Sequence, residues 1–340
     1  MVTIKDVARV AGVSIGTVSN VLNGKESVRL QNREKVYKAV DQLGFQYNMT
    51  ASALRTKTTK NIGLIIPTIV NPFYPELARG VEDEARKAGF TVFLCNSDRE
   101  EEKERNYIGA LLSKGVDGII LLKPKSSQEE LRRLNSQIAL VVEDWDYRSD
   151  QELMTVSSDG YMAVIQAMNL LFQYKHRKIA FISGLMESPS GFGKMRAYEK
   201  SLESRNISYR SEYVAYGDYS WKSGYAVAKE FVKLETAPTA ILAANDMMAM
   251  GAMKAVQSMG YRVPADISVM GIDGIEMGKL CTPSLTTVLQ PKYEVGVAAF
   301  RLLGRILAGE AIPEDKRHIM LETRIMERES VAYADESRLI

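Results

Sequence analysis

The first part of the chain repeats apolar residues every three or four positions, which is the spacing of amphipathic helices. A first helix is predicted to begin after Thr3, which can form a cap with Asp6, and to end at Gly12. A second helix begins after Ser14. The two apolar faces consist of Ile4, Val7, Ala8 and Ala11, and of Val18, Val21 and Leu22. The outward side of the second helix then carries Ile15, Gly16, Thr17, Ser19 and Asn20, which is typical of a helix-turn-helix with an exposed recognition helix.

A third helix and a polar linker follow. The helical spacing of Val36, Ala39, Val40 and Leu43 predicts the third helix, and Gly44 ends it. Residues 47–60 form a linker that can contain one short helix, and Leu54 is its core-forming residue. Two interpretations of Leu54 stay open at this point. It packs against the body, or it inserts between base steps in the minor groove of DNA.

From residue 61 onward, short apolar strands alternate with amphipathic helices. This order predicts parallel sheets covered by helices on both faces, in one run over 62–142 and another from about residue 159. The fold class is an all-α helix-turn-helix head with a hinge helix, followed by an α/β body of two doubly wound lobes. The predicted domains are the helix-turn-helix head over 1–46, the hinge over 47–60 and the body over 61–340. The first lobe of the body comprises about 61–157 with part of 290–325, and the second comprises about 158–289 with the C-terminal tail. Residues 319–326 are expected to form a strand.

The charge distribution supports a nucleic-acid-binding head. Residues 1–60 contain ten Lys or Arg and four Asp or Glu, whereas the whole chain contains 44 and 42. A basic head on a mildly acidic body is typical of a DNA-binding module attached to another domain. The chain has two cysteines, no apolar run of about 18 residues and no signal peptide, so we expect a cytoplasmic protein that neither spans nor binds a membrane. His176, between Lys175 and Arg177, is expected on the surface.

Several short motifs occur in order along essentially the full chain. They include Thr3-Ile-Lys-Asp-Val-Ala8, Gly12-Val-Ser-Ile-Gly-Thr-Val-Ser19, Asn61-Ile-Gly-Leu-Ile-Ile-Pro67, Asn71-Pro-Phe-Tyr74, Gly271-Ile-Asp273 and Thr282-Pro-Ser-Leu-Thr-Thr287. In these motifs the chain resembles the lac repressor and galactose repressor family of bacterial transcription regulators. The resemblance implies a homodimer that binds a near-palindromic DNA operator in response to a small-molecule effector, and that associates with the nucleoid when bound. It implies no cofactor and leaves a co-regulator protein unidentified.

The resemblance also assigns residues that contact DNA. Ile15, Gly16 and Asn20 occupy the positions that select operator bases, and Thr17 and Ser19 those that contact phosphates. Asn20 is the best candidate for reading a base, because a carboxamide can pair with the edge of adenine. The linker matches the family at Leu54, which favours the minor-groove interpretation, although Tyr47 stands where many members have proline. The remaining assigned DNA-binding residues are Thr3, Ser14, Asn23, Asn48, Ala51 and Arg55.

A second set of residues is assigned to a ligand cleft between the lobes. The set is Phe73, Tyr74, Asp144, Ser188, Ser190, Lys194, Tyr219, Asn245 and Asp273, with Trp145 and Trp221 close by. Aromatic faces combined with Asp, Asn and Lys suit a sugar or related polyol. Lys194 departs from the family, in which arginine is frequent at this position. A carboxylated ligand, a phosphorylated sugar and a purine or nucleoside remain alternatives, and the sequence does not reveal whether the effector induces or co-represses.

Two other classes of protein fit the sequence less well. An enzyme would need catalytic or metal-binding residues at recognisable spacing, and the chain has no such motif and only two histidines, His176 and His318. A free-standing solute receptor would explain the body alone, but it would explain neither the basic head nor the missing signal peptide. We therefore expect a ligand-responsive repressor of carbohydrate uptake or catabolism genes.

Overall fold

A computed structural model describes residues 2–22, 27–45, 58–145, 151–186 and 188–334. The chain divides into two compact units, Met1–Thr59 and Lys60–Ile340, which are described separately below. The predictions for Asn23, Asn48, Ala51, Leu54 and Arg55 lie outside the described residues. No helix in the described part of the chain is both long and apolar enough to cross a membrane.

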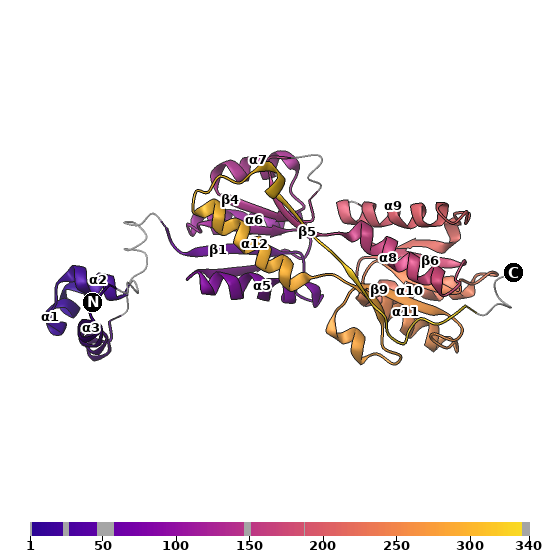
Figure 1. Cartoon of the computed structure of the whole chain (residues 1–340), viewed down its shortest axis with the longest axis horizontal. Helices are drawn as coiled ribbons and strands as arrows, with labels where there is room; N and C mark the ends of the chain where they lie inside the picture. Colours follow the sequence, from indigo (N-terminus) through magenta and orange to yellow (C-terminus); the bar gives the residue numbers. More distant parts are fainter. Residues whose placement is uncertain (1, 23–26, 46–57, 146–150, 187, 335–340) are drawn as a thin grey trace. The chain divides into compact units, whose positions relative to one another are not determined.

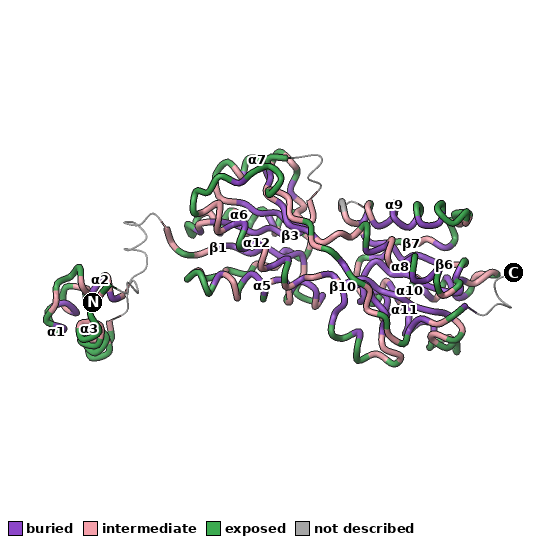
Figure 2. The backbone as a smooth tube through the Cα atoms, viewed as in Figure 1, coloured by how far each residue is buried: buried purple, intermediate pink, exposed green. Residues whose placement is uncertain are grey.

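The described residues of the first unit form three helices around a small core, as predicted. They are α1 (Ile4–Ala11), α2 (Ile15–Leu22) and α3 (Leu30–Leu43), shown in Figure 1. Figure 2 distinguishes their buried residues from their exposed ones. The core comprises Val7, Ala8, Ala11, Val18, Val21, Val36 and Ala39, which includes most of the apolar positions expected from helical spacing.

Local capping explains where α1 and α2 begin. The Asp6 amide donates to Thr3 Oγ1 at 3.4 Å, and the Thr3 amide donates to Asp6 Oδ2 at 3.0 Å, which completes the predicted capping box. Gly12 ends α1 with a φ of 64°, a left-handed conformation that glycine adopts without steric cost. Ser14 Oγ accepts from the Thr17 amide at 3.1 Å. The turn between the helices is therefore specified by local residues.

The first lobe of the second unit is a parallel sheet covered on both faces. Its strand order is β11-β5-β4-β3-β1-β2. The strands are β1 (Asn61–Ile66), β2 (Thr91–Asn96), β3 (Gly118–Leu122), β4 (Ala139–Glu143), β5 (Met154–Ser158) and β11 (His318–Leu321). Its helices are α5 (Phe73–Lys87), α6 (Glu101–Ser113), α7 (Gln128–Gln137) and α12 (Lys292–Leu307) (Figure 1).

Alternate residues of each strand pack against different helices. In β1, Ile62, Leu64 and Ile66 contact the core under α5 and α12, whereas Ile65 contacts the core under α6 and α7. A slip of one residue would exchange these two faces. Strands β1, β3 and β4 are buried on both faces, which explains their nearly continuous apolar sequences, whereas the edge strand β2 exposes Phe93 and Leu94.

The second lobe repeats this architecture. Its strand order is β12-β10-β9-β8-β6-β7, parallel except for the antiparallel pair of β10 and β12. The strands are β6 (Ile179–Ser183), β7 (Val214–Tyr216), β8 (Ala240–Ala243), β9 (Ser268–Asp273), β10 (Thr286–Leu289) and β12 (Arg324–Met326). Its helices are α8 (Gly160–Gln173), α9 (Pro189–Glu203), α10 (Trp221–Lys233) and α11 (Asp246–Ser258). The predicted class of a two-sheet, mostly parallel α/β body is confirmed.

The chain passes between the two sheets after β5, after β10 and after β11. The predicted strand over 319–326 is therefore two strands, β11 and β12, one in each sheet. Strand β5 was not predicted, because its residues Met154-Thr-Val-Ser-Ser158 are partly polar. This strand is specified by its parallel pairing with β4 and β11, which are distant contacts that local periodicity does not contain.

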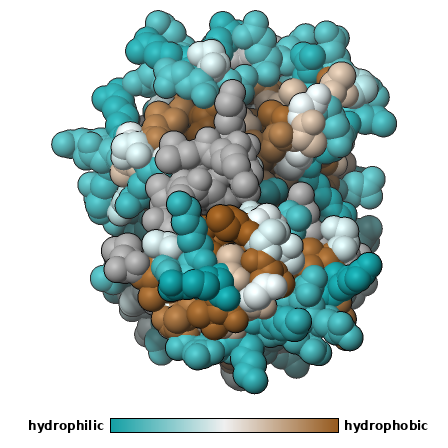
Figure 3. Space-filling view, turned by 90° about the vertical axis from the view of Figure 1, so that its left-hand side faces the viewer, coloured by the Kyte–Doolittle hydropathy of each residue, from teal (hydrophilic) through white to brown (hydrophobic). Residues whose placement is uncertain are grey.

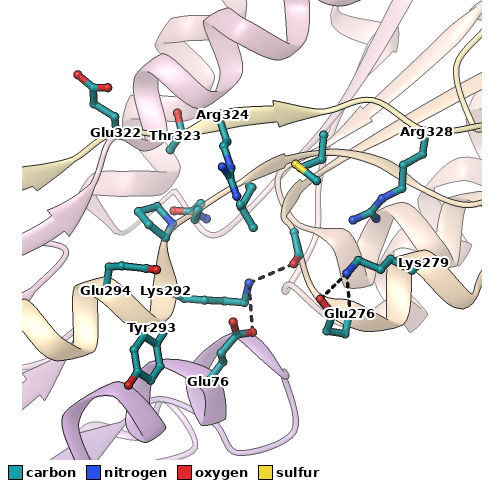
Figure 4. Close-up of a pocket in the computed structure, with 15 residues that line it drawn as sticks. Glu76, Glu276, Lys279, Lys292, Tyr293, Glu294, Glu322, Thr323, Arg324 and Arg328 are labelled. Carbon is teal, nitrogen blue, oxygen red and sulfur yellow. Dashed lines mark hydrogen bonds and ion pairs between the residues drawn. The ribbon is translucent and has the colours of Figure 1, made fainter. Parts of the chain in front are cut away.

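A buried lysine joins the lobes at these crossings. Lys292 Nζ donates to the Gly274 carbonyl at 3.1 Å and pairs with the Glu76 carboxylate at 3.2 Å (Figure 4). Glu76 belongs to α5 of the first lobe, and Gly274 follows β9 of the second. A cavity of about 660 Å³ lies beside this contact.

On the face of the molecule seen in Figure 3, hydrophilic side chains dominate and hydrophobic ones form separate patches.

The prediction that His176 lies on the surface is wrong. Its side chain is buried, with Nδ1 2.9 Å from Thr239 Oγ1 and Nε2 3.0 Å from the Ala332 carbonyl oxygen. Burial lowers the pKa of His176 to about 4, because the imidazolium loses its hydration. The charged neighbours suggested exposure, but the contact with residue 332 depends on the tertiary fold.

We predict that His176 makes the protein less stable in mild acid. The folded state holds this imidazole neutral, whereas the unfolded chain protonates it near its ordinary pKa of 6.5. The stabilisation is therefore present above the unfolded pKa and is lost as the pH falls toward 4. Between about pH 7 and pH 5 the loss is about 2 kcal/mol. His176→Gln should reduce the fall in melting temperature over this range; an unchanged pH dependence would contradict the assignment.

Candidate functional site

Residues that follow the carboxyl ends of several parallel strands of the second unit line one cavity. Lys123 follows β3, Asp144 and Trp145 follow β4, and Leu185 follows β6 at a short distance. Ligands of doubly wound sheets bind at this edge. A cavity of about 450 Å³ lies here, lined from the first lobe by residues that include Arg99, Lys123, Asp144 and Trp145, and from the second lobe by Leu185, Ser188 and Tyr219.

An ion pair lies in the lining of this cavity. Lys123 Nζ lies 2.8 Å from Asp144 Oδ2 and donates to Ser190 Oγ of the second lobe at 3.2 Å. Burial disfavours both charges, but the attraction between them outweighs it, so the pKa of Lys123 is raised and the pKa of Asp144 is lowered. Both groups are therefore charged at neutral pH. The contact to Ser190 connects the two lobes directly.

A second cluster of polar residues is buried in the second lobe. Gln290 Nε2 donates to Asp273 Oδ1 at 2.7 Å, and Lys194 Nζ donates to the Ala244 carbonyl at 3.0 Å. Asn245 Nδ2 donates to the Tyr219 carbonyl at 3.1 Å. Burial, and then the charge of Asp246, raise the pKa of Asp273 to about 7. This carboxyl group can therefore gain or lose a proton near neutral pH.

Three buried polar atoms near the cavity have no hydrogen-bond partner among the described residues. They are Glu143 Oε2, Trp145 Nε1 and the Tyr219 hydroxyl oxygen. Burial raises the pKa of Glu143 to about 8, so this group carries a proton at neutral pH. Buried polar groups normally have partners, and a polar ligand that enters the cavity can supply them. This concentration of unmatched atoms marks the cavity as a candidate binding site.

The structure places the residues assigned to the cleft in three settings. Asp144, Ser188 and Tyr219 line the cavity, and Ser190 contacts Lys123. Lys194, Asn245 and Asp273 are buried and engaged in the hydrogen bonds described above. Phe73 and Tyr74 are also buried and contribute to the core of the first lobe, while Trp221 is 47% exposed.

Several residues of the site were not predicted from the sequence. They are Arg99, Lys123, Glu143 and Gln290. Lys123 directly follows a predicted strand, so the rule that ligands lie beyond the carboxyl ends of parallel strands would have found it. Gln290 had no comparable signal, because its contact with Asp273 joins residues 17 positions apart. No group of three potential metal ligands occurs among the residues that the structure describes.

The second candidate surface is the outward side of α2 in the first unit. Ile15 is 46% exposed, and Ser14 and Gly16 are also accessible. Thr17 and Asn20 are half-buried. Ser19 is 7% exposed, which corrects the prediction that it points outward. It lies about 60° around the helix from Leu22, so the edge of the apolar face covers its small side chain.

A helix-turn-helix unit and a two-lobed α/β unit with a polar cavity define a class of transcription regulators with a body like that of a solute receptor. Residues 3–48 match the family described as bacterial regulatory proteins, lacI family, and residues 168–331 match a periplasmic binding protein-like domain. Catabolite control protein A of Priestia megaterium is 36% identical over 330 residues, which cover 97% of this chain and 99% of that protein. The chain belongs to the lacI family, whose members are regulators rather than enzymes.

Another relative and two solved structures extend this similarity. The HTH-type transcriptional repressor PurR of Proteus mirabilis is 35% identical over 335 residues, which cover 98% of this chain and 97% of that protein. The lac repressor dimer bound to operator and the anti-inducer ONPF has a TM-score of 0.84 at 27% identity, over 97% of this chain and 99% of that one. The complex of the transcriptional regulator CelR with cellobiose has a TM-score of 0.73 at 28% identity, over 97% and 100% of the two chains. The similarity therefore includes both units of the chain.

We predict that Lys123→Gln destabilises the second unit by about 1–3 kcal/mol, because it leaves the Asp144 carboxylate without its cation. The two side chains are 22% and 14% exposed, so solvent screens the pair only in part. Melting temperature measured by calorimetry tests this prediction. Lys233→Gln is the matched control, because it breaks the exposed pair with Glu230 and should cost less than about 1 kcal/mol. Equal effects of the two substitutions would contradict a special role for Lys123.

Proposed function

We propose that this protein is a dimeric repressor of carbohydrate uptake or catabolism genes that binds a near-palindromic operator in response to a sugar or sugar derivative. One combination of observations carries the proposal. The basic head exposes one side of α2, and the body contains a cavity beside buried polar atoms that lack hydrogen-bond partners among the described residues. The lac repressor dimer on operator DNA supports the DNA-binding part of the proposal. The CelR complex with cellobiose supports a carbohydrate as effector.

In this proposal, α2 enters the major groove. Asn20 reads a base edge, Ile15 makes apolar contact with a base, and Thr17 contacts phosphate. Gly16 adds no side chain, so few hydrogen bonds select the bases. DNA shape, dimerisation and Leu54 in the minor groove would supply further selectivity.

The cavity would couple effector binding to DNA binding. Lys123 and Ser190 belong to different lobes, so a ligand that displaces or reinforces their contact changes the balance between lobe arrangements. Rotation of the lobes in a dimer would alter the spacing of the two linkers. A coupling free energy of about 1–3 kcal/mol would change operator affinity by about 5- to 150-fold.

We predict that Asn20→Ala weakens binding to a selected operator by about 1–3 kcal/mol and leaves binding to random DNA nearly unchanged, because it removes a base contact and no charge. Operators selected from random duplexes and titrated by gel shift provide the measurement. Lys38→Gln on α3 is the control for charge, since it should lower affinity for both kinds of DNA or neither. The DNA-binding proposal fails if the wild-type protein selects no sequence, or if its DNA affinity does not fall with rising salt.

A further inference from the structure

We propose that the effector carries a carboxylate or phosphate group, and that Arg99 and Lys123 bind this group in the cavity of about 450 Å³. The inference deepens the proposed function and rests on it, because it specifies the chemistry of the same effector. Sugar acids and phosphorylated sugars share this chemistry: each combines hydroxyl groups with an anion.

Arg99 supplies a cation that is not neutralised. Its guanidinium lies 5.4 Å from the centroid of the Tyr219 ring, and it forms no ion pair with a carboxylate among the described residues. A guanidinium can donate two parallel hydrogen bonds to a carboxylate or phosphate. Since Arg99 belongs to the first lobe and Tyr219 to the second, an anion beside them would contact both lobes.

The charges that line the cavity favour an anion. Arg99, Lys123 and Lys125 are the lining cations, and Glu101 and Asp144 are the lining acids. Asp144 is already paired with Lys123. Glu143 lies next to Asp144 in the sequence, and its raised pKa of about 8 removes one further negative charge from the region at neutral pH.

The cavity of about 660 Å³ beside Lys292 provides a contrast. Its lining at the lobe crossing contains four basic residues, Lys279, Lys292, Arg324 and Arg328, and four acidic ones, Glu76, Glu276, Glu294 and Glu322. Lys292 and Lys279 are paired with Glu76 and Glu276 (Figure 4). The cavity of about 450 Å³ is therefore lined by one more cation than acid, whereas the cavity of about 660 Å³ is lined by equal numbers.

Two of the three unmatched atoms near the cavity, Trp145 Nε1 and the Tyr219 hydroxyl, agree with this charge. The indole N–H of Trp145 can only donate, and the hydroxyl of Tyr219 can donate. Ammonium and guanidinium groups also only donate, whereas the oxygens of a carboxylate or a phosphate dianion only accept. The acceptors of the lining include the carboxylates of Glu101 and Asp144 and the hydroxyls of Ser126 and Ser188. These groups can accept from the hydroxyl groups of a sugar.

The two tryptophans allow a direct test with the full chain. Trp145 lines the cavity, and Trp221 is 47% exposed. In a Trp221→Phe variant, the fluorescence of Trp145 therefore reports on the cavity alone. Glucuronate, gluconate, glucose 6-phosphate and inorganic phosphate are titrated at constant ionic strength, with glucose and adenosine as uncharged comparisons. We expect at least one anionic sugar to bind about tenfold or more tightly than glucose. Comparison of the sugar acids with glucose 6-phosphate and phosphate shows whether the bound group is a carboxylate or a phosphate.

Substitutions at Arg99 test the assigned residue. Arg99→Gln should weaken binding of the anionic sugar about tenfold or more, and Arg99→Lys should weaken it less, because the charge remains without the planar fork. Arg133→Gln, an exposed change on α7, should leave binding unaffected. The inference is overturned if glucose or adenosine binds as tightly as every anion, if no anion changes the Trp145 signal, or if Arg99→Gln has no effect. Loss of sequence-selective DNA binding would instead overturn the proposed function.

Discussion

Polar contacts join the two lobes of the second unit, and a ligand at the lobe boundary can act on them. Lys123 joins the first lobe to Ser190 of the second, and Lys292 joins Glu76 to Gly274. Each lobe has its own apolar core, so a change in lobe orientation need not expose either core. Because hydrogen bonds and ion pairs typically contribute only about 1 kcal/mol each, a ligand can alter their balance.

The parallel sheets explain why these charges meet. Strand ends carry Lys123 and Asp144 in the first lobe, and Asn245 and Asp273 in the second. The central strands are apolar on both faces and offer few places for polar groups. The binding chemistry is therefore concentrated in the loops after the strands, and the core fixes their positions. Burial then shifts the pKa values of Glu143 and Asp273 upward.

Local sequence determined the parts of the fold that depend on nearby residues. The capping box of Thr3 and Asp6, the end of α1 at Gly12 and the bounds of α5 follow from short patterns. His176 and Ser19 were wrongly predicted to be exposed, and β5 was not predicted. The surroundings of His176 and β5 come from residues distant in the sequence, and Ser19 is covered by the neighbouring apolar face of its helix. In the site, Asp144 was assigned by resemblance, whereas its partner Lys123 was not predicted, although its position directly after β3 was a usable signal; the pairing itself depends on the tertiary structure.

The location of Arg99 at the lobe boundary bears on coupling as well as on affinity. A ligand shifts a conformational equilibrium only by its difference in affinity for the two states. An anion held by Arg99 alone would bind equally well in any arrangement of the lobes. Because the Arg99 guanidinium lies over Tyr219 of the other lobe, and Lys123 reaches Ser190, the surroundings of the anion change when the lobes move. The position of these two cations therefore makes an anionic effector suited to control as well as to binding.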